Sequence, residues 1–285
     1  MSGNARTTAN LYALGAIALW SSLATLVVQL ARVPPLLLTG LALIIGSIPA
    51  WPYARRWRVA PQALLVGVGG LFGYHFLLFL GLRNAPAVQA NLVNYLWPLL
   101  MVLGAPLLLP GMRLRALHVL AALLGFGGAA LAIVGGHALQ GGLAWGYLPA
   151  FGAALCWAGF SLGSRWLLQR GLGFPTAALG LFALLSGLLA LLSHALLEPA
   201  ATLDAAAWWR IALLGLGPLG AAFYLWDRAL KHGDARTIGV LSYLTPLAST
   251  TLLVLTTGRA FSWNLAVAAL LIVGAALLAM RASSA

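Results

Sequence analysis

Amide and phenol side chains recur along one face of the segment 86–109. The polar positions, and the proline that follows them, are Asn91, Asn94, Tyr95 and Pro98. Their spacing of i, i+3, i+4 and i+7 places them on one face of a helix. Amides and phenols bind a small zwitterion through hydrogen bonds, but they offer no activated nucleophile. We therefore interpret this face as the wall of a binding cavity, with hydrogen bonding to a neighbouring helix as the alternative.

Other side chains suited to binding fall near the middle of long apolar runs. They are Tyr74, His75, Trp97, Trp157 and Tyr243, together with Trp20. Trp and Tyr of membrane proteins normally lie at the two interfaces, so positions at mid-run indicate an aromatic cavity or, equally, core packing. His75 is the one group here that titrates near neutral pH, although a structural role is its simpler explanation. The predicted binding residues are Tyr74, His75, Asn91, Asn94, Tyr95, Trp97, Trp157 and Tyr243.

The composition indicates which kind of element carries these residues. Of the 285 residues, 62% are hydrophobic and 7% are charged. A soluble domain carries roughly 25% charged residues, enough to cover a surface that faces water. The chain is therefore predicted to be an all-α integral membrane protein.

Ten segments are long and apolar enough to cross a bilayer as helices, which takes about 20 residues each. The predicted spans are 10–31, 34–53, 62–82, 86–109, 115–135, 143–165, 175–197, 207–228, 235–257 and 261–280. The connections between them are too short to hold a separate catalytic domain. The function is therefore expected to lie within the bilayer.

Basic residues indicate the orientation of these spans, because short cytoplasmic loops accumulate Lys and Arg. If the N-terminus is cytoplasmic, that side receives most of the 16 basic residues: Arg6, Arg55, Arg56, Arg58, Arg113, Arg115, Arg165, Arg170, Arg228, Lys231, Arg236 and Arg281. The opposite side keeps Arg32, Arg83, Arg210 and Arg259, with Glu198 and Asp204. Both termini are therefore predicted to be cytoplasmic.

The chain contains an internal repeat, since residues 63–99 align on residues 211–247 without a gap. The alignment matches Gly67 with Gly215, Gly69 with Gly217, Tyr95 with Tyr243 and Pro98 with Pro246. Shared composition explains matching leucines but not this pattern. We predict one five-helix repeat at 8–136 and a second at 142–281. Because five is odd, the second repeat enters the membrane in the opposite sense, as is typical of secondary transporters with a site between the halves.

Proline occupies the same position in both halves. Pro98 and Pro246 each follow a tyrosine by three residues. A proline inside a helix removes one backbone hydrogen bond and kinks the helix. The pair is predicted either to act as hinges of two gates or to form static bends.

Several functions are excluded by residues that the chain lacks. Lys231 is its only lysine, so there is no phosphate-binding loop for ATP, and Cys156 is its only cysteine. We expect neither a metal nor a cofactor, and we attribute the net charge of +12 to topology signals rather than to nucleic acid. Only Asp227 brings a carboxylate near a span. An uncharged cavity suits a neutral or zwitterionic solute and leaves no evident carboxylate for proton coupling.

Ten spans in two inverted halves resemble the drug/metabolite transporter superfamily in its EamA-type branch. The segment Asn94-Tyr95-Leu96-Trp97-Pro98, preceded by Asn91 and by Tyr74-His75, is similar to the amino acid exporters of that branch. The resemblance implies export of amino acids, aromatic ones foremost, across a bacterial inner membrane. It also implies that spans five and ten are peripheral. Small multidrug-resistance relatives carry a glutamate in their first span, whereas Trp20-Ser21-Ser22 has none, which argues against proton-coupled cation antiport.

The sequence therefore predicts a secondary transporter that works by alternating access through a central, uncharged, aromatic cavity. Its expected partners are amino acids and the lipid bilayer, and it is expected to act as a monomer or a weak homo-oligomer. Another drug or metabolite of the same superfamily is the alternative substrate. A phosphorylated substrate would require Arg83 or Arg228 to point to the midplane. An intramembrane enzyme would require His75 beside a buried serine, and no G-x-S-x-G segment accompanies it.

Overall fold

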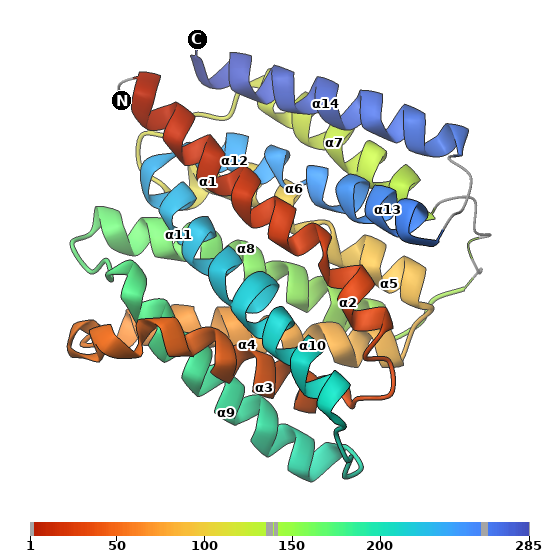
Figure 1. Cartoon of the computed structure of the whole chain (residues 1–285). Helices are drawn as coiled ribbons and strands as arrows, with labels where there is room; N and C mark the ends of the chain where they lie inside the picture. Colours follow the sequence, from red (N-terminus) through yellow and green to blue (C-terminus); the bar gives the residue numbers. More distant parts are fainter. Residues whose placement is uncertain (1–2, 135–138, 140–141, 258–261, 285) are drawn as a thin grey trace.

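The computed structural model describes residues 3–134, 139, 142–257 and 262–284, and all regular structure in these residues is helical (Figure 1). The first half contains α1 (Gly3–Ser21), α2 (Leu23–Val28), α3 (Pro35–Ser47), the 3-10 helix η1 (Ile48–Arg56), α4 (Pro61–Arg83), α5 (Ala87–Asn94), α6 (Trp97–Leu108) and α7 (Ala116–Val134). The second half contains α8 (Tyr147–Gln169), the 3-10 turn η2 (Thr176–Ala178), α9 (Leu179–Leu197), α10 (Ala205–Leu216), the π turn η3 (Gly217–Ala221), α11 (Ala222–His232), α12 (Ala235–Leu241), α13 (Leu244–Thr257) and α14 (Trp263–Ser284).

Nine helical stretches of the described chain are long and apolar enough to cross a membrane. They are Ala5–Val28, Pro35–Arg56, Pro61–Arg83, Ala87–Leu108, Ala116–Val134, Thr176–Leu197, Ala205–His232, Ala235–Thr256 and Trp263–Ala282, and they overlap nine of the predicted spans. The other predicted span, 143–165, falls on the 23-residue α8, which is not among the nine. Helix α8 packs against α4, α5, α6 and α11 on one side and exposes Leu148, Phe151 and Leu155 on another.

Two of the predicted spans are divided where the repeat places its prolines. Pro98 and Pro246 have no N–H group, so the carbonyls of Asn94 and Ser242, four residues earlier, lack their usual helical donor. At these points α5 gives way to α6, and α12 gives way to α13. The sequence predicted continuous, kinked helices here, and the structure instead shows helix breaks.

The helices pair across the two halves of the chain. Helix α1 packs on α11, α3 on α9, α4 on α8, α6 on α12 and α7 on α14. Figure 1 shows these long helices side by side, with the beginning of α1 and the end of α14 at the same end of the bundle. Each pair therefore joins a helix from before residue 135 to one from after residue 141.

Helix α3 is held close to its neighbours by glycines. A Cβ atom at Gly187 of α9 would lie 2.8 Å from the Gly40 carbonyl oxygen, and one at Gly46 would lie 2.7 Å from the Gly215 carbonyl oxygen. Only glycine allows backbones to approach this closely. The contacts position the middle and end of α3, whose first turns line the cavity described next.

Candidate binding cavity

A cavity of about 520 Å³ lies between helices of both halves. Its wall includes side chains from α1 to α6, from α8, from α10 to α11 and from α13, whereas α7 and α14 contribute none of its described lining residues. The wall extends from Trp20 and Trp157 to Arg83, the last residue of α4. The Arg83 side chain is 47% exposed. Arg83 therefore marks the mouth of the cavity, at the C-terminal end of α4.

Aromatic rings form the floor of the cavity, and Trp157 lies at their centre. Its ring centroid is 5.2–6.5 Å from those of Trp20, Tyr74, Trp97, Phe160, Phe223 and Trp226. Trp97 also meets Trp226 edge to face at 5.7 Å. The floor therefore presents flat apolar surface to a ligand and separates the cavity from the other end of the bundle.

The polar ends of two floor tryptophans are occupied by the protein. The π turn η3 bonds the Ala222 N–H to the Gly217 carbonyl, five residues back, and the nearby Pro218 carbonyl accepts the Trp20 indole N–H at 3.1 Å. The Trp226 indole N–H donates to the Ser161 hydroxyl at 3.1 Å. Trp20 therefore contributes apolar surface to the cavity rather than a hydrogen bond, and the fully buried Trp226 supports the floor from behind.

The predicted polar face of 86–109 forms one wall of the cavity. Asn91, Asn94 and Tyr95 all line it. The Asn94 amide donates to the Tyr74 hydroxyl at 3.3 Å, but its carbonyl oxygen has no partner, although the residue is 98% buried. A buried carbonyl oxygen without a partner is costly to the protein and available to a ligand donor.

His75 faces the cavity from α4 with one nitrogen already bonded. Its Nδ1 donates to the Leu71 carbonyl at 2.7 Å, so the neutral ring offers Nε2 as an acceptor. The ring lies among those of Tyr74, Phe79 and Phe223. The structural role and the cavity position expected of His75 are therefore compatible.

The structure brings most of the predicted binding residues together. Seven of the eight line the cavity: Tyr74, His75, Asn91, Asn94, Tyr95, Trp97 and Trp157. Tyr243 does not, because at the break between α12 and α13 its ring turns to Gly125 and Phe126 of α7 and is fully buried there. Neither Pro98 nor Pro246 lines the cavity. Thr245 and Ser249 of α13 do line it; the sequence analysis did not select them, since isolated hydroxyl residues usually join helices.

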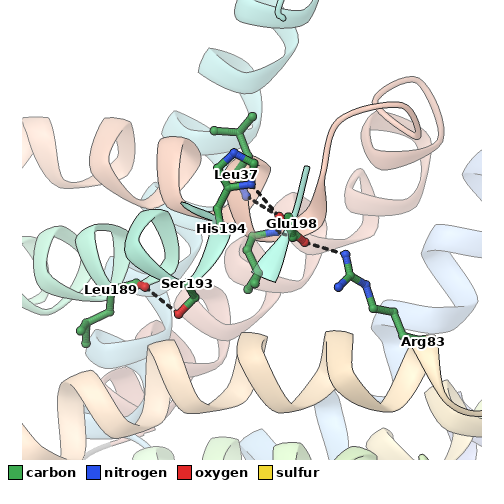
Figure 2. Close-up of polar contacts among 7 residues, drawn as sticks. Leu37, Arg83, Leu189, Ser193, His194 and Glu198 are labelled. Atoms are coloured by element: carbon green, nitrogen blue, oxygen red, sulfur yellow. Dashed lines mark hydrogen bonds and ion pairs between the residues drawn. The ribbon is translucent and has the colours of Figure 1, made fainter. Parts of the chain in front are cut away.

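An ion cluster stands beside the mouth (Figure 2). The Glu198 carboxylate is fully buried and accepts hydrogen bonds from the backbone N–H groups of Leu36 (3.1 Å) and Leu37 (3.3 Å), the first turn of α3. It also pairs with Arg83 at 2.8 Å and with His194 at 3.0 Å. Glu198, the residue that follows α9, therefore caps α3 and neutralises the cation at the cavity wall.

Ionic contacts also hold the opposite end of the bundle together. The Lys231 ammonium group donates to the buried Asp227 carboxylate at 2.6 Å and to the Phe174 carbonyl at 2.8 Å. Asp234 caps α12 there and binds Arg236, with distances of 2.6–3.0 Å. Burial acts to raise the pKa of the Asp234 carboxyl, but the hydrogen bonds and charge of Arg236 outweigh it, so the pKa lies below its usual range.

The cations that a phosphorylated substrate would need are engaged away from the midplane. Arg83 is bound to Glu198 at the mouth. Arg228 lies over the Tyr12 ring, 5.7 Å from its centroid, on the far side of the floor. Among the described lining residues, Arg83 alone carries a permanent charge.

Comparison with known proteins identifies relatives over the full length of the chain. Residues 7–134 and residues 144–281 match the EamA-like transporter family. The chain is 41% identical to the aromatic amino acid exporter YddG of Ancylobacter novellus, over 96% of this chain and 97% of that protein. It is 30% identical to a probable terminal-alkyne amino-acid exporter of Streptantibioticus cattleyicolor, over 74% and 70% of the two chains. A solved structure with 41% sequence identity matches with a TM-score of 0.89 over 97% of each chain.

Proposed function

Because this chain belongs to the EamA-like transporter family, we propose that it is a secondary transporter that exports amino acids, aromatic ones foremost, through the cavity between its helices. The observation that carries the proposal is the composition of that cavity. It combines an aromatic floor, a wall of amides and hydroxyls, and one cation that is already neutralised. The relatives named as exporters of amino acids support this substrate class.

The floor suits the apolar body of an aromatic amino acid. A volume of about 520 Å³ lies within the range of about 300–1,000 Å³ typical of small-molecule sites. A flat ring stacks offset or edge to face on Trp97 and Trp157, which gives about 0.5–1.5 kcal/mol per pair beyond the area that is buried. The charged head of the ligand then lies towards Asn91, Asn94 and His75, where oxygen and nitrogen acceptors meet its ammonium group.

We further propose ten crossings in two inverted halves, 8–136 and 142–281, with α8 as the sixth crossing. The cross-half packing supports this arrangement. If α1 corresponds to α8 and α4 to α11, then the contact of α1 with α11 and that of α4 with α8 are one contact seen twice. The separate matches of 7–134 and 144–281 to the same family add support.

The proposed orientation places the protein in a bacterial inner membrane with both termini in the cytoplasm. The mouth beside Arg83 then faces away from the cytoplasm, and the floor with the Lys231–Asp227 pair closes the cytoplasmic side. Export requires the opposite state as well, in which the floor opens and the mouth closes. The breaks before Pro98 and Pro246 are the proposed hinges of this exchange. One chain encloses the whole cavity, so a monomer is the proposed working unit.

Equilibrium binding to purified protein tests the proposal. We expect L-tryptophan to raise the unfolding temperature in detergent, because a ligand that binds only the folded state stabilises it. We expect Tyr95→Ala to weaken binding at least tenfold, since Tyr95 lines the cavity beside the floor. Tyr53→Ala is the control, because Tyr53 is exposed in η1 outside the cavity. Equal binding by both variants, or no response of the wild type to any amino acid, would contradict the proposal.

A further inference from the structure

Thr245 differs from most helical hydroxyl residues of this protein in having no partner. Ser21 and Ser164 donate to the carbonyl four residues earlier, each at 2.7 Å, as such residues usually do in apolar surroundings. Thr245 makes no such bond, although the residue is 93% buried, and it lines the cavity. Its oxygen is thus buried and unpaired, in a residue that lines the cavity.

The position of Thr245 explains why its hydroxyl is free. It is the second residue of α13, directly after the break, and its N–H bonds to the Ser242 carbonyl three residues back. The regular turn that would offer an i−4 carbonyl is therefore interrupted. Ser249 follows one turn later on the same face and also lines the cavity.

A second unpaired polar atom lies beside the other helix break. The Asn94 side-chain carbonyl oxygen belongs to the last residue of α5, and it too is buried and unpaired in a residue that lines the cavity. The two atoms come from the two halves of the chain and flank breaks at corresponding positions of the repeat. Discontinuous helices of this kind commonly supply the polar groups of transporter sites.

We infer that Asn94 and Thr245 form the subsite that selects the α-ammonium and α-carboxylate groups of the transported amino acid. This assignment rests on the proposed function. The Asn94 carbonyl oxygen can only accept, so it binds the ammonium group, while its amide group stays bonded to Tyr74. The Thr245 hydroxyl can donate, so it binds the carboxylate, with Ser249 as the neighbouring hydroxyl.

The two roles predict opposite selectivity for two ligands that each lack one charged group. Tryptamine has the ammonium group of tryptophan without the carboxylate, and indole-3-propionate has the carboxylate without the ammonium group. A hydrogen bond to a charged group changes affinity by about tenfold or more. Loss of the Thr245 hydroxyl must therefore weaken the binding only of ligands that carry a carboxylate. Loss of the Asn94 side-chain oxygen must weaken the binding only of ligands that carry an ammonium group.

The test measures binding of tryptophan, tryptamine and indole-3-propionate to wild type, Thr245→Val, Thr245→Ser and Asn94→Leu. We expect Thr245→Val to weaken the binding of tryptophan and of indole-3-propionate at least tenfold and to leave the binding of tryptamine unchanged. We expect Thr245→Ser to bind all three ligands as the wild type does. We expect Asn94→Leu to weaken tryptophan and tryptamine but not indole-3-propionate. Thr251→Val is the matched control, because Thr251 lies on the same helix outside the cavity.

If a variant still binds one of the three ligands as tightly as the wild type does, that variant is folded. The inference is overturned if Thr245→Val weakens tryptamine binding as much as tryptophan binding. It is also overturned if the Thr245→Val protein binds tryptophan as tightly as the Thr251→Val protein does. A wild type that binds none of the three ligands contradicts the proposed function instead. The two failures are therefore distinguishable.

Discussion

Replacing Trp157 with alanine is expected to abolish transport and to lower the free energy of unfolding by about 3–5 kcal/mol. Trp157 is 96% buried and its ring touches six others in the floor. Truncation leaves a hole at the centre of this cluster and removes the surface on which a ligand ring would stack. Because Trp97 and Trp20 lose a common neighbour, the floor no longer separates the cavity from the other end of the bundle.

Two comparisons separate the loss of folding from the loss of function for Trp157. Trp157→Phe keeps an aromatic ring and is expected to retain part of both properties. Trp209→Ala removes a tryptophan that is 66% exposed, and it should change neither thermal unfolding in detergent nor tryptophan binding. If Trp157→Ala unfolded and bound ligand as Trp209→Ala does, the floor would have no role in either property.

Glu198→Ala is expected to have the second large effect, a loss of about 1–3 kcal/mol of stability, because it leaves N–H groups at the start of α3 without their acceptor. The substitution removes the ion-pair partner of the Arg83 guanidinium, one partner of His194, and the acceptor for the first N–H groups of α3 (Figure 2). The Arg83 side chain is 47% exposed, so solvent compensates much of its charge, and the main cost is the loss of the acceptor at the start of α3. The start of α3, which lines the cavity mouth, is then expected to separate from α9.

Glu198→Gln should fall between the wild type and Glu198→Ala, because an amide oxygen still accepts from α3 but carries no charge for Arg83. Ser193→Ala is the control in the preceding helix α9, since the Ser193 hydroxyl donates to the Leu189 carbonyl four residues earlier (Figure 2). Thermal unfolding of the purified wild type, Glu198→Gln, Glu198→Ala and Ser193→Ala proteins measures this order of stability. A Glu198→Ala protein as stable as Ser193→Ala would show that the cluster is not a structural support.

The polar face of 86–109 was predictable because membrane helices turn amides away from lipid, and a spacing of three and four residues is readable in sequence. Asn91, Asn94 and Tyr95 accordingly lie together on the cavity wall. The EamA resemblance stated from Asn94-Tyr95-Leu96-Trp97-Pro98 is confirmed by the family match. The polar face of this helix and the family of the chain could therefore be predicted from local sequence patterns.

Tyr243 and Thr245 show where the pattern stops being informative. Tyr243 matches Tyr95 in the repeat, yet its ring turns to α7. The two halves of the chain need not place matching side chains alike in a given conformational state. Thr245 was missed because a lone threonine in an apolar run carries no sign that its hydroxyl is unpaired. That fact depends on the break before it, which local spacing does not reveal.

Helix α8 gives a third lesson about burial. The serines and Arg165 of α8 lower its mean hydropathy. These residues lie on a helix that packs against α4, α5, α6 and α11. The Arg165 guanidinium donates to the carbonyls of Leu230 and Lys231 at 2.6 Å each, at the cytoplasmic end proposed for the bundle. A helix with polar residues on its packed face therefore has a lower mean hydropathy than a helix that is apolar on every face.

Counterflow in proteoliposomes tests the central proposal most directly. Vesicles containing the protein are loaded with unlabelled tryptophan and diluted, without a pH gradient, into a trace of labelled tryptophan. A carrier that exposes one cavity to each side in turn must accumulate the label transiently above its equilibrium level, and Tyr95→Ala must reduce that peak. Entry of the label without such a peak, or no entry beyond that in protein-free vesicles, would contradict an amino acid carrier built around this cavity.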